Sequence, residues 1–265
     1  MQTCFAEQSY VVKHYQSQAR YQFGHELLQL ALSKVDKKYT INAFDRYPIN
    51  EARGEKMLSN GDFDVQWLST SVAREENLIP IKIPIYRGLL GLRLLLVKKQ
   101  YKNKFSHIET VEDLRKYTGG HGSHWTDLSV YPANQLPVHT NANYDPLFLQ
   151  LANDRFDYFH RGLNEIWREY LKHKDKLAIA DNVMLYYPNP VYYFVNKNKP
   201  ELASAITKGL NIALNDGSYK ALFFKQHGDN IEKGNLKSRT LITLVNPDIP
   251  KGTPKINTDW WLPKP

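Results

Sequence analysis

The chain has 265 residues, 42% of them hydrophobic and 12% aromatic, with a formal net charge of +8. This length and composition are typical of a folded globular protein with one large domain or two smaller ones, and they exclude a disordered chain. No apolar run approaches the roughly 20 residues that cross a bilayer, and the longest apolar stretch, 88–97, is interrupted by Arg93.

The N-terminus holds the only cysteine, Cys4, so no intramolecular disulfide can form. The letters CFA before Glu7 resemble the small-residue ending of a secretory signal, although only three residues precede Cys4. We interpret residues 1–6 as the remnant of a signal peptide, with chance resemblance as the alternative.

Strands and helices alternate along the first part of the chain. Period-2 and period-3.6 apolar patterns predict strands at 9–15, 39–44 and 63–71 and helices at 23–35 and 48–61. The second helix is expected to stop at Asn60-Gly61, because glycine is favoured just after a helix end. Alternating strands and helices favour βαβ units and a largely parallel sheet.

The second part continues in the same manner, with the predicted segments as follows: two strand-like runs within 79–99, a short helix at 111–117, a glycine-rich turn at 118–125, a helix at 144–155, a strand at 156–162, a helix at 163–171, a strand at 189–197, and two helices within 200–228 divided at Asp216-Gly217. The tail from Pro247 is expected to be irregular.

The basic residues are scattered, with small clusters at 98–104 (KKQYKNK) and 172–176 (KHKDK). Neither cluster resembles a helix that reads a nucleic-acid groove, and no zinc-finger or RNA-binding motif is present. We therefore predict a solvated basic surface and no nucleic-acid partner.

Two stretches are nearly alike: LSNGDFDVQW from Leu58 and LANDRFDYFH from Leu151. Each closes a helix, turns at an asparagine and sends Phe-Asp into a strand. Their separation is too large for a solenoid repeat. We interpret them as equivalent elements of two similar α/β lobes; convergent turn chemistry is the alternative. Phe63 and Phe156 are expected in the core, and Asp64 and Asp157 are expected to fix turns.

Four segments in this order resemble bacterial periplasmic solute-binding proteins of the amino-acid-binding class, extracellular solute-binding protein family 3. The segments are LSNGDFDVQWLSTSVAREENLIPI, IETVEDLRKYTGGHGSHW, LFLQLANDRFDYFHRG and NPVYYFVNKNKPELASAITKGLNIALNDGSYKALFFKQHG. The resemblance covers residues from about Ser9 to Gly228.

The resemblance implies a two-lobed α/β periplasmic-binding-protein-like type II fold, with two mixed sheets flanked by helices and joined by two hinge strands. Lobe 1 would comprise residues 7–96 plus 189–265, and lobe 2 residues 97–188. Stretches 88–97 and 189–196 would carry the crossings. Ligand is held between the lobes in this family and stabilises the closed state.

In lobe 1, Arg74 matches the family arginine that holds a ligand carboxylate, for which a guanidinium fork is suited. Ser69 and Ser71 match the hydroxyl-bearing positions before it. The alternative is a surface arginine beside Glu75 and Glu76, which would form weak exposed pairs.

In lobe 2, the glycine-rich segment matches the family turn at a helix N-terminus, where backbone N–H groups favour an anion. Gly122, Ser123 and His124 would supply the donors; a plain tight turn is the alternative. His121 and His124 lack further His or Cys partners in the sequence, so no metal site and no cofactor are expected.

Family members usually carry an acidic residue that holds the ammonium group of the ligand. In this chain the matching position is Gly162, and Arg161 precedes it. A cation at this place suits a ligand with two anionic groups, or one anion shared between Arg74 and Arg161. Glu165 could restore an ammonium site, or Arg161 could instead be its structural partner at i and i+4.

Aromatic residues Tyr15, Trp67 and Trp125 are candidate walls of the ligand site, and core packing is the alternative, strongest for Trp67.

Together these features predict a periplasmic, monomeric, non-enzymatic binding protein. Its small ligand would be amino-acid-like or a carboxylate, expected to be anionic, and would be delivered to a membrane transporter or sensor. A lyase or dehydratase on the same fold, using His121, His124, His160 or Glu165, and a degenerate member acting through protein interaction are the alternatives.

Overall fold

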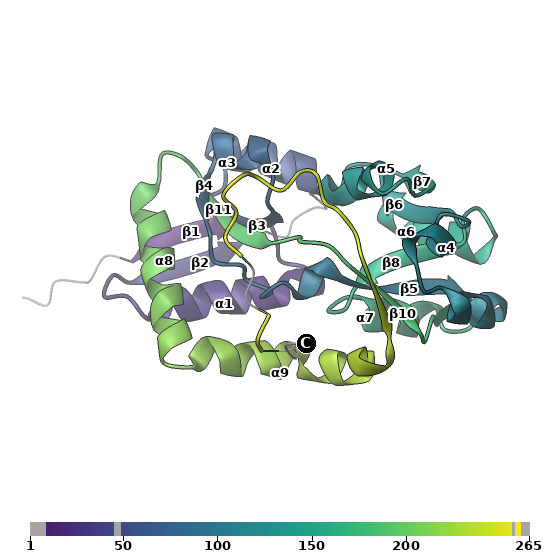
Figure 1. Ribbon diagram of the computed structural model, residues 1–265. Coiled ribbons are helices and arrows are strands. Elements are labelled where there is room, and N and C mark those ends of the chain that lie inside the picture. The colour runs from purple at the N-terminus through teal and green to yellow at the C-terminus, as the bar shows by residue number, and fades with distance from the viewer. Residues whose placement is uncertain (1–8, 45–48, 256–257, 261–265) are drawn as a thin grey trace, which may run out of the picture. The chain divides into compact units, whose positions relative to one another are not determined.

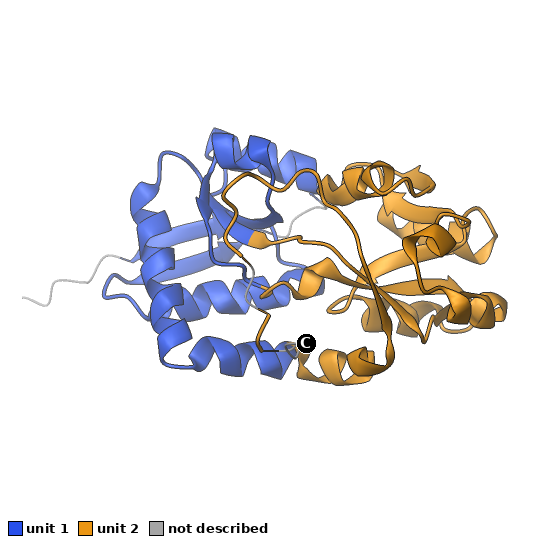
Figure 2. Cartoon of the chain, viewed as in Figure 1, with its two compact units in different colours: residues 1–85, 192–226 blue, residues 86–191, 227–265 orange. Residues whose placement is uncertain are grey.

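The computed structural model describes residues 9–44, 49–255 and 258–260 (Figure 1). The chain forms two compact units, Met1–Ile85 with Tyr192–Gln226 as unit 1 and Tyr86–Val191 with His227–Pro265 as unit 2 (Figure 2). Within the described residues no helix is long and apolar enough to cross a membrane. The interpretation of residues 1–6 as a signal remnant falls outside the described part of the chain.

The strands of unit 1 form two ladders. Strands β1 (Tyr10–His14) and β2 (Tyr39–Ala43) pair in parallel. The second ladder has the order β3-β11-β4, with β3 at Val65–Ser69, β4 at Ile79–Ile81 and β11 at Val191–Val195. The side-chain amide of Gln16 joins the ladders, since it donates to the carbonyl of Trp67 and accepts from its N–H, both at 2.8 Å.

Four helices of unit 1 follow the predicted positions: α1 (Gln22–Ser33), α2 (Glu51–Asn60), α8 (Pro200–Asn215) and α9 (Ser218–Gly234), which begins in this unit. The short helix α3 (Val72–Asn77) and the 3₁₀ turn η1 (Ala19–Tyr21) were not predicted. The predicted stop of the second helix is confirmed, because Gly61 has φ 91°, a conformation that glycine adopts without strain. Helix α1 packs against α8. The core of unit 1 includes Leu27, Leu28, Leu58 and Phe194, all 0% exposed.

Unit 2 is built on one mixed sheet. Its strand order is β12-β10-β5-β8-β6-β7, and β9 also pairs with β5. The strands are β5 (Leu92–Lys98), β6 (Gly119–Gly122), β7 (Val138–Asn141), β8 (Tyr158–Gly162), β9 (Leu177–Ile179), β10 (Val183–Tyr186) and β12 (Thr240–Thr243). Strand β5 runs antiparallel to β8, β9 and β10, whereas β6 is parallel to β7 and β8.

Short helices surround this sheet: α4 (Val111–Leu114), α5 (Val130–Ala133), α6 (Tyr144–Ala152) and α7 (Ile166–His173), with 3₁₀ segments η2 (Leu89–Gly91), η3 (Lys99–His107), η4 (Thr126–Ser129) and η5 (Leu236–Ser238). Thr110 and Asp113 form a capping box that starts α4. The core of the sheet includes Leu95, Tyr158 and Leu185.

The two Phe-Asp junctions have the same hydrogen bonds. The Asp64 carboxylate accepts from the Lys13 N–H at 2.7 Å, while the Asp64 N–H donates to the Lys13 carbonyl at 2.9 Å. Asp157 makes both bonds with Thr118, each at 2.8 Å. Each aspartate therefore ties the start of its strand to a distant part of the chain, Lys13 of β1 or Thr118 just before β6, rather than fixing a local turn as predicted. Phe63 and Phe156 are buried, as expected.

One predicted element is wrong. The segment 118–125 was expected to be a glycine-rich turn at a helix N-terminus, but Gly119–Gly122 form strand β6 inside the sheet. Any side chain at Gly119 or Gly120 would collide with the rings of Tyr131 and Phe156, which pack against the strand. Glycine is used here for close packing, so the segment lacks the β-branched residues by which a strand is recognised.

The bounds of the units differ from those expected of the lobes. Residues 86–96 lie in unit 2, because β5 pairs with strands β8, β9 and β10 of that unit. Residues 227–265 also lie in unit 2, where β12 pairs with β10. The chain passes between the units at 85/86, within β11 at 191/192 and within α9 at 226/227 (Figure 2).

Candidate functional site

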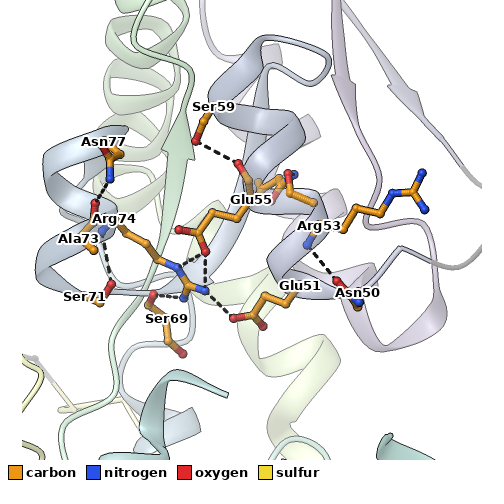
Figure 3. A network of polar contacts seen from close by, with 12 residues as sticks. Asn50, Glu51, Arg53, Glu55, Ser59, Ser69, Ser71, Ala73, Arg74 and Asn77 are labelled. Carbon is orange, nitrogen blue, oxygen red and sulfur yellow. Dashed lines mark hydrogen bonds and ion pairs between the residues drawn. The ribbon is translucent and has the colours of Figure 1, made fainter. Parts of the chain in front are cut away.

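Arg74, the strongest sequence candidate, is a buried residue of unit 1, 3% exposed, on helix α3 (Figure 3). Its Nη2 donates to Glu51 Oε1 at 2.7 Å, and its Nε donates to Glu55 Oε2 at 2.9 Å. Its Nη1 donates to the carbonyl oxygen of Ser69 at 2.6 Å. The guanidinium thus joins α2 to the end of β3.

The local sequence explains this placement. Ser71 caps α3 by accepting from the Arg74 N–H at 3.3 Å, and Asn50 caps α2 by accepting from the Arg53 N–H at 2.9 Å. Glu51 and Glu55 are four residues apart on α2, so they share the helix face that looks toward Arg74 (Figure 3). The hydroxyl of Ser71 is therefore engaged in capping, and Ser69 contributes its carbonyl.

The charges around Arg74 are those of an ion-pair cluster. Burial lowers the pKa of Arg74, but the charges of Glu51 and Glu55 outweigh it, and the pKa lies above its ordinary value. The alternative of a surface arginine paired with Glu75 is not found, because Glu75 pairs with Lys82 at 2.6 Å. A ligand carboxylate at Arg74 would compete with two carboxylates already in place.

Arg161 in unit 2 forms a more deeply buried cluster. It lies on β8 and is 5% exposed. Its Nε contacts Glu169 Oε2 at 2.7 Å and its Nη2 contacts Glu169 Oε1 at 2.9 Å, a bidentate pair. Its Nη2 also lies 3.0 Å from Glu165 Oε2, so the predicted i, i+4 ion pair is present.

Aromatic rings enclose the Arg161 guanidinium. Its Cζ lies 4.9 Å from the ring centroid of Trp125, 5.0 Å from that of Phe159 and 5.6 Å from that of Tyr144. Tyr144 also donates to Glu169 at 2.5 Å. Within the described residues, Nη1 of Arg161 has no hydrogen-bond partner. One edge of the guanidinium is fixed, and the Nη1 amino group retains both of its donors.

A second buried ion pair, absent from the sequence predictions, adjoins this cluster. Arg93 Nη2 donates to Asp127 Oδ2 at 2.7 Å, and Arg93 Nη1 lies 3.9 Å from Glu165 Oε2. Asp127 also accepts from Tyr187 at 2.7 Å and lies 3.1 Å from His121 Nε2. Burial raises the pKa of Asp127, but the opposing effect of His121 and Arg93 is larger. The pKa of Asp127 therefore lies well below its ordinary value.

The feature of the sequence that indicates this buried ion pair is Arg93 itself. Arg93 interrupts an apolar run that forms the largely buried strand β5, and a buried arginine requires an acid partner. Which acid supplies that partner could not be derived, because Asp127 is 34 residues away along the chain.

The glycine-rich segment offers fewer donors than predicted. The Ser123 N–H donates to the Asn141 carbonyl at 3.0 Å, and the Trp125 N–H donates to the Gly122 carbonyl at 3.2 Å. His124 is exposed. The helical turns that follow, η4 and α5, have four residues each. The Ser123 N–H is already bonded and is therefore not free to bind an anion. An anion site at Gly122, Ser123 and His124 stays a prediction.

The candidate wall residues divide between packing and the Arg161 cluster. Tyr15 and Trp67 are 5% and 3% exposed and pack in unit 1, Tyr15 against Phe63 and Trp67 against His14 and Tyr193. This is the packing role that the sequence left as the alternative. Trp125 stacks on Phe159 beside Arg161. No group of three or more His, Cys, Asp or Glu residues in the described chain could hold a metal ion.

No protein-family model and no curated protein sequence matches the chain. Solved structures do match. An arginine-specific periplasmic binding protein of Salmonella typhimurium is 16% identical, covers 83% of this chain and 99% of its own, and gives a TM-score of 0.61. An ancestral arginine-binding protein bound to arginine is 17% identical, covers 82% and 97%, and gives a TM-score of 0.60.

The chain has the periplasmic-binding-protein fold. The two-lobed α/β fold predicted from the sequence is thereby confirmed. A further match is the ancestral amino-acid-binding protein AncCDT-1, a precursor of cyclohexadienyl dehydratase, at 17% identity, 82% and 95% coverage and a TM-score of 0.59. The fold therefore occurs both in binding proteins and in a precursor of an enzyme.

Proposed function

We propose that this protein is a substrate-binding protein that captures a small amino-acid-like or carboxylate ligand and presents it to a membrane transporter or sensor. It works outside the cytoplasm, as a monomer and without chemistry. The observation that carries the proposal is the Arg161 guanidinium, which is fixed on one edge by Glu169 and retains an unpaired Nη1, in a fold whose solved members include arginine-binding proteins.

Arg161 is suited to receive an anionic oxygen. Because Glu169 and the rings of Trp125 and Phe159 hold the guanidinium in place, little side-chain entropy is lost when Nη1 donates to a ligand. Arg161 is also only 5% exposed, and burial away from water strengthens a charge-assisted hydrogen bond. An oxygen of a ligand carboxylate is the group that fits.

Glu165 is suited to receive an ammonium group. Its side chain is 24% exposed, whereas those of Asp127 and Glu169 are 9% and 3% exposed. It is thus the most accessible of these three carboxylates, and it lies 3.0 Å from Arg161 Nη2. An amino acid carries both an ammonium and a carboxylate, and the Arg161 cluster offers a partner for each.

Arg74 has a supporting role in this proposal. Its Nε and Nη1 donate to Glu55 and Ser69, and its Nη2 contacts both Glu51 and Glu55, so four of its five N–H groups are engaged and only one, on Nη1, is left for a ligand. Enzymatic use of the fold is not proposed, since His121 and His160, two of the acid–base candidates, are 0% and 2% exposed.

A thermal-shift screen of amino acids and dicarboxylates, followed by isothermal titration of the best ligand, tests the proposal. We expect Arg161→Lys to lower affinity at least tenfold, because an ammonium cannot hold Glu169 and a ligand oxygen in the same geometry. Arg115→Lys, the same change at a half-buried arginine paired with Glu112, is the matched control and should bind normally. A flat screen, or equal affinity of wild type and Arg161→Lys, would contradict the proposal.

A further inference from the structure

The two lysine-rich segments of the sequence meet at one edge of the unit 2 sheet. Strand β5 ends at Lys98, which is in register with Leu177 at the start of β9. The next residue, Lys99, donates its N–H to the Lys176 carbonyl at 2.8 Å. The fold therefore joins the clusters 98–104 and 172–176 into one surface, which we call the basic edge: Lys98, Lys99, Lys172, Lys174 and Lys176.

The basic edge is hollowed and well exposed. A depression of about 360 Å³ lies there, lined by Lys98, Lys99, Gln100, Ala152, Asp175 and Lys176. Lys98 pairs with Asp154. The other four lysines of the edge are exposed, and none of them forms an ion pair with a described residue. Their charges are available to an external partner.

Apolar side chains accompany these charges. Leu171 on α7 is 65% exposed and Leu149 on α6 is 55% exposed. The two helices are neighbours, because the rings of Phe148 and His173 stack with their centroids 4.5 Å apart. On α7, Leu171 shares its exposed face with Arg168, which lies three residues earlier.

The basic edge lies away from the Arg161 cluster within unit 2. Strand β8 runs antiparallel to β5, so Arg161 at the end of β8 is level with Leu94 near the start of β5. Lys98 is at the opposite end of the same strand. Four residues of extended strand separate these positions, roughly 13 Å, and the basic edge extends beyond Lys98. An occupant of the basic edge would leave the Arg161 cluster accessible.

We propose that the basic edge docks on the anionic phospholipid headgroups of a membrane surface. Lysine ammoniums are attracted to anionic headgroups, and exposed leucines among them can enter the boundary between headgroups and acyl chains. A purely electrostatic contact with an acidic protein would make no use of Leu149 and Leu171. This docking goes beyond ligand capture and does not depend on it.

Cosedimentation of the full chain with vesicles tests the proposal. We expect binding to vesicles of phosphatidylcholine with 30% phosphatidylglycerol in 50 mM salt, and loss of binding in 300 mM salt and on pure phosphatidylcholine. The triple variant Lys99→Glu, Lys172→Glu, Lys176→Glu should bind at least tenfold more weakly. Leu171→Ser should weaken binding about threefold with the charge unchanged.

The control is a triple variant with the same charge change on unit 1, Lys56→Glu, Lys220→Glu, Lys225→Glu, all at exposed positions. It should retain most of the vesicle binding. Circular dichroism of each variant verifies that the fold is intact. Equal losses in the two triple variants would show attraction by net charge alone and overturn the proposal. Absence of binding to the anionic vesicles, which leaves an acidic protein as the partner, would also overturn it.

Discussion

Arg74 in unit 1 and Arg161 in unit 2 follow matching Phe-Asp junctions, and each contacts two carboxylates. Their partners differ in exposure. The side chains of Glu51 and Glu55 are 33% and 28% exposed, and Glu165 beside Arg161 is similar at 24%, whereas the second partner of Arg161, Glu169, is only 3% exposed. Arg161 also stacks against aromatic rings, and no ring contact of this kind is found for Arg74 among the described residues.

The difference shows how one residue type serves two purposes on equivalent elements. Arg74 uses Nε, Nη1 and Nη2 to join α2 to β3, with partners that water can also reach. Arg161 holds a buried acid with Nε and Nη2 and keeps Nη1 unpaired. The energetic cost of removing each arginine should therefore differ, and so should the effect on ligand binding.

The largest effect is expected for Arg161→Met. It leaves Glu169 buried without its cation, which costs about 3–5 kcal/mol of unfolding free energy. The double variant Arg161→Met, Glu169→Leu should recover most of this loss, because no buried charge is left unpaired. Urea unfolding monitored by circular dichroism measures both. A loss below 1 kcal/mol in the single variant would contradict the buried-pair description.

The pH dependence should come next in size and affect both units. Burial, with a further contribution from His25, lowers the pKa of His14 in unit 1 to about 3, and burial lowers the pKa of His227 in unit 2 to about 4. Both histidines are neutral in the folded state, whereas the unfolded chain takes up protons below pH 6.5. The folded state therefore has its full stability above pH 6.5, and the free energy of unfolding decreases as the pH falls towards 4.

Each histidine should lower the free energy of unfolding by roughly 2 kcal/mol at pH 5 relative to pH 7. Variants His14→Gln and His227→Phe should each show a pH dependence weaker by that amount in urea unfolding at the two pH values. If both variants keep the full wild-type pH dependence, these histidines are not the titrating groups.

A smaller loss is expected for Arg74→Met, about 1–2 kcal/mol, since Glu51 and Glu55 can be rehydrated when the guanidinium is removed. Comparison with Arg161→Met under the same urea conditions tests the difference in burial directly. Equal losses at the two positions would remove the distinction between the clusters.

The smallest effect is expected for Ser71→Ala, about 1 kcal/mol, because the variant loses the N-cap of α3. Ser59→Ala is a suitable control, since the Ser59 hydroxyl bonds only to the Glu55 carbonyl one turn earlier. Weaker ligand binding by Ser71→Ala with unchanged stability would instead identify this hydroxyl as a ligand contact.

Local patterns predicted much of the fold. The helix stop at Gly61 and the division of the last helices at Asp216-Gly217 follow from turn chemistry and periodicity, and the structure has both of them. Strand β6 was missed because glycines carry no side chain from which a period could be detected.

The partners of the buried arginines were harder to predict. The sequence places Glu75 next to Arg74, but adjacent helix residues do not face each other, and the actual partners lie 19 and 23 residues earlier on α2. For Arg161, the contact with Glu165 was suggested by their separation of four residues, although Arg161 lies on strand β8 and not on a helix. The bidentate pair with Glu169 depends on how α7 packs against β8. Only the assembled unit fixes such pairs.

The most direct test of the central claim is parallel isothermal titration of Arg161→Lys and Arg74→Lys with the ligand found by screening. Both variants keep the charge, so each retains a cation for its acids. The unpaired Nη1 of Arg161 predicts a loss of affinity of at least tenfold for Arg161→Lys and a clearly smaller loss for Arg74→Lys. A tenfold loss for Arg74→Lys with wild-type affinity for Arg161→Lys would contradict the account.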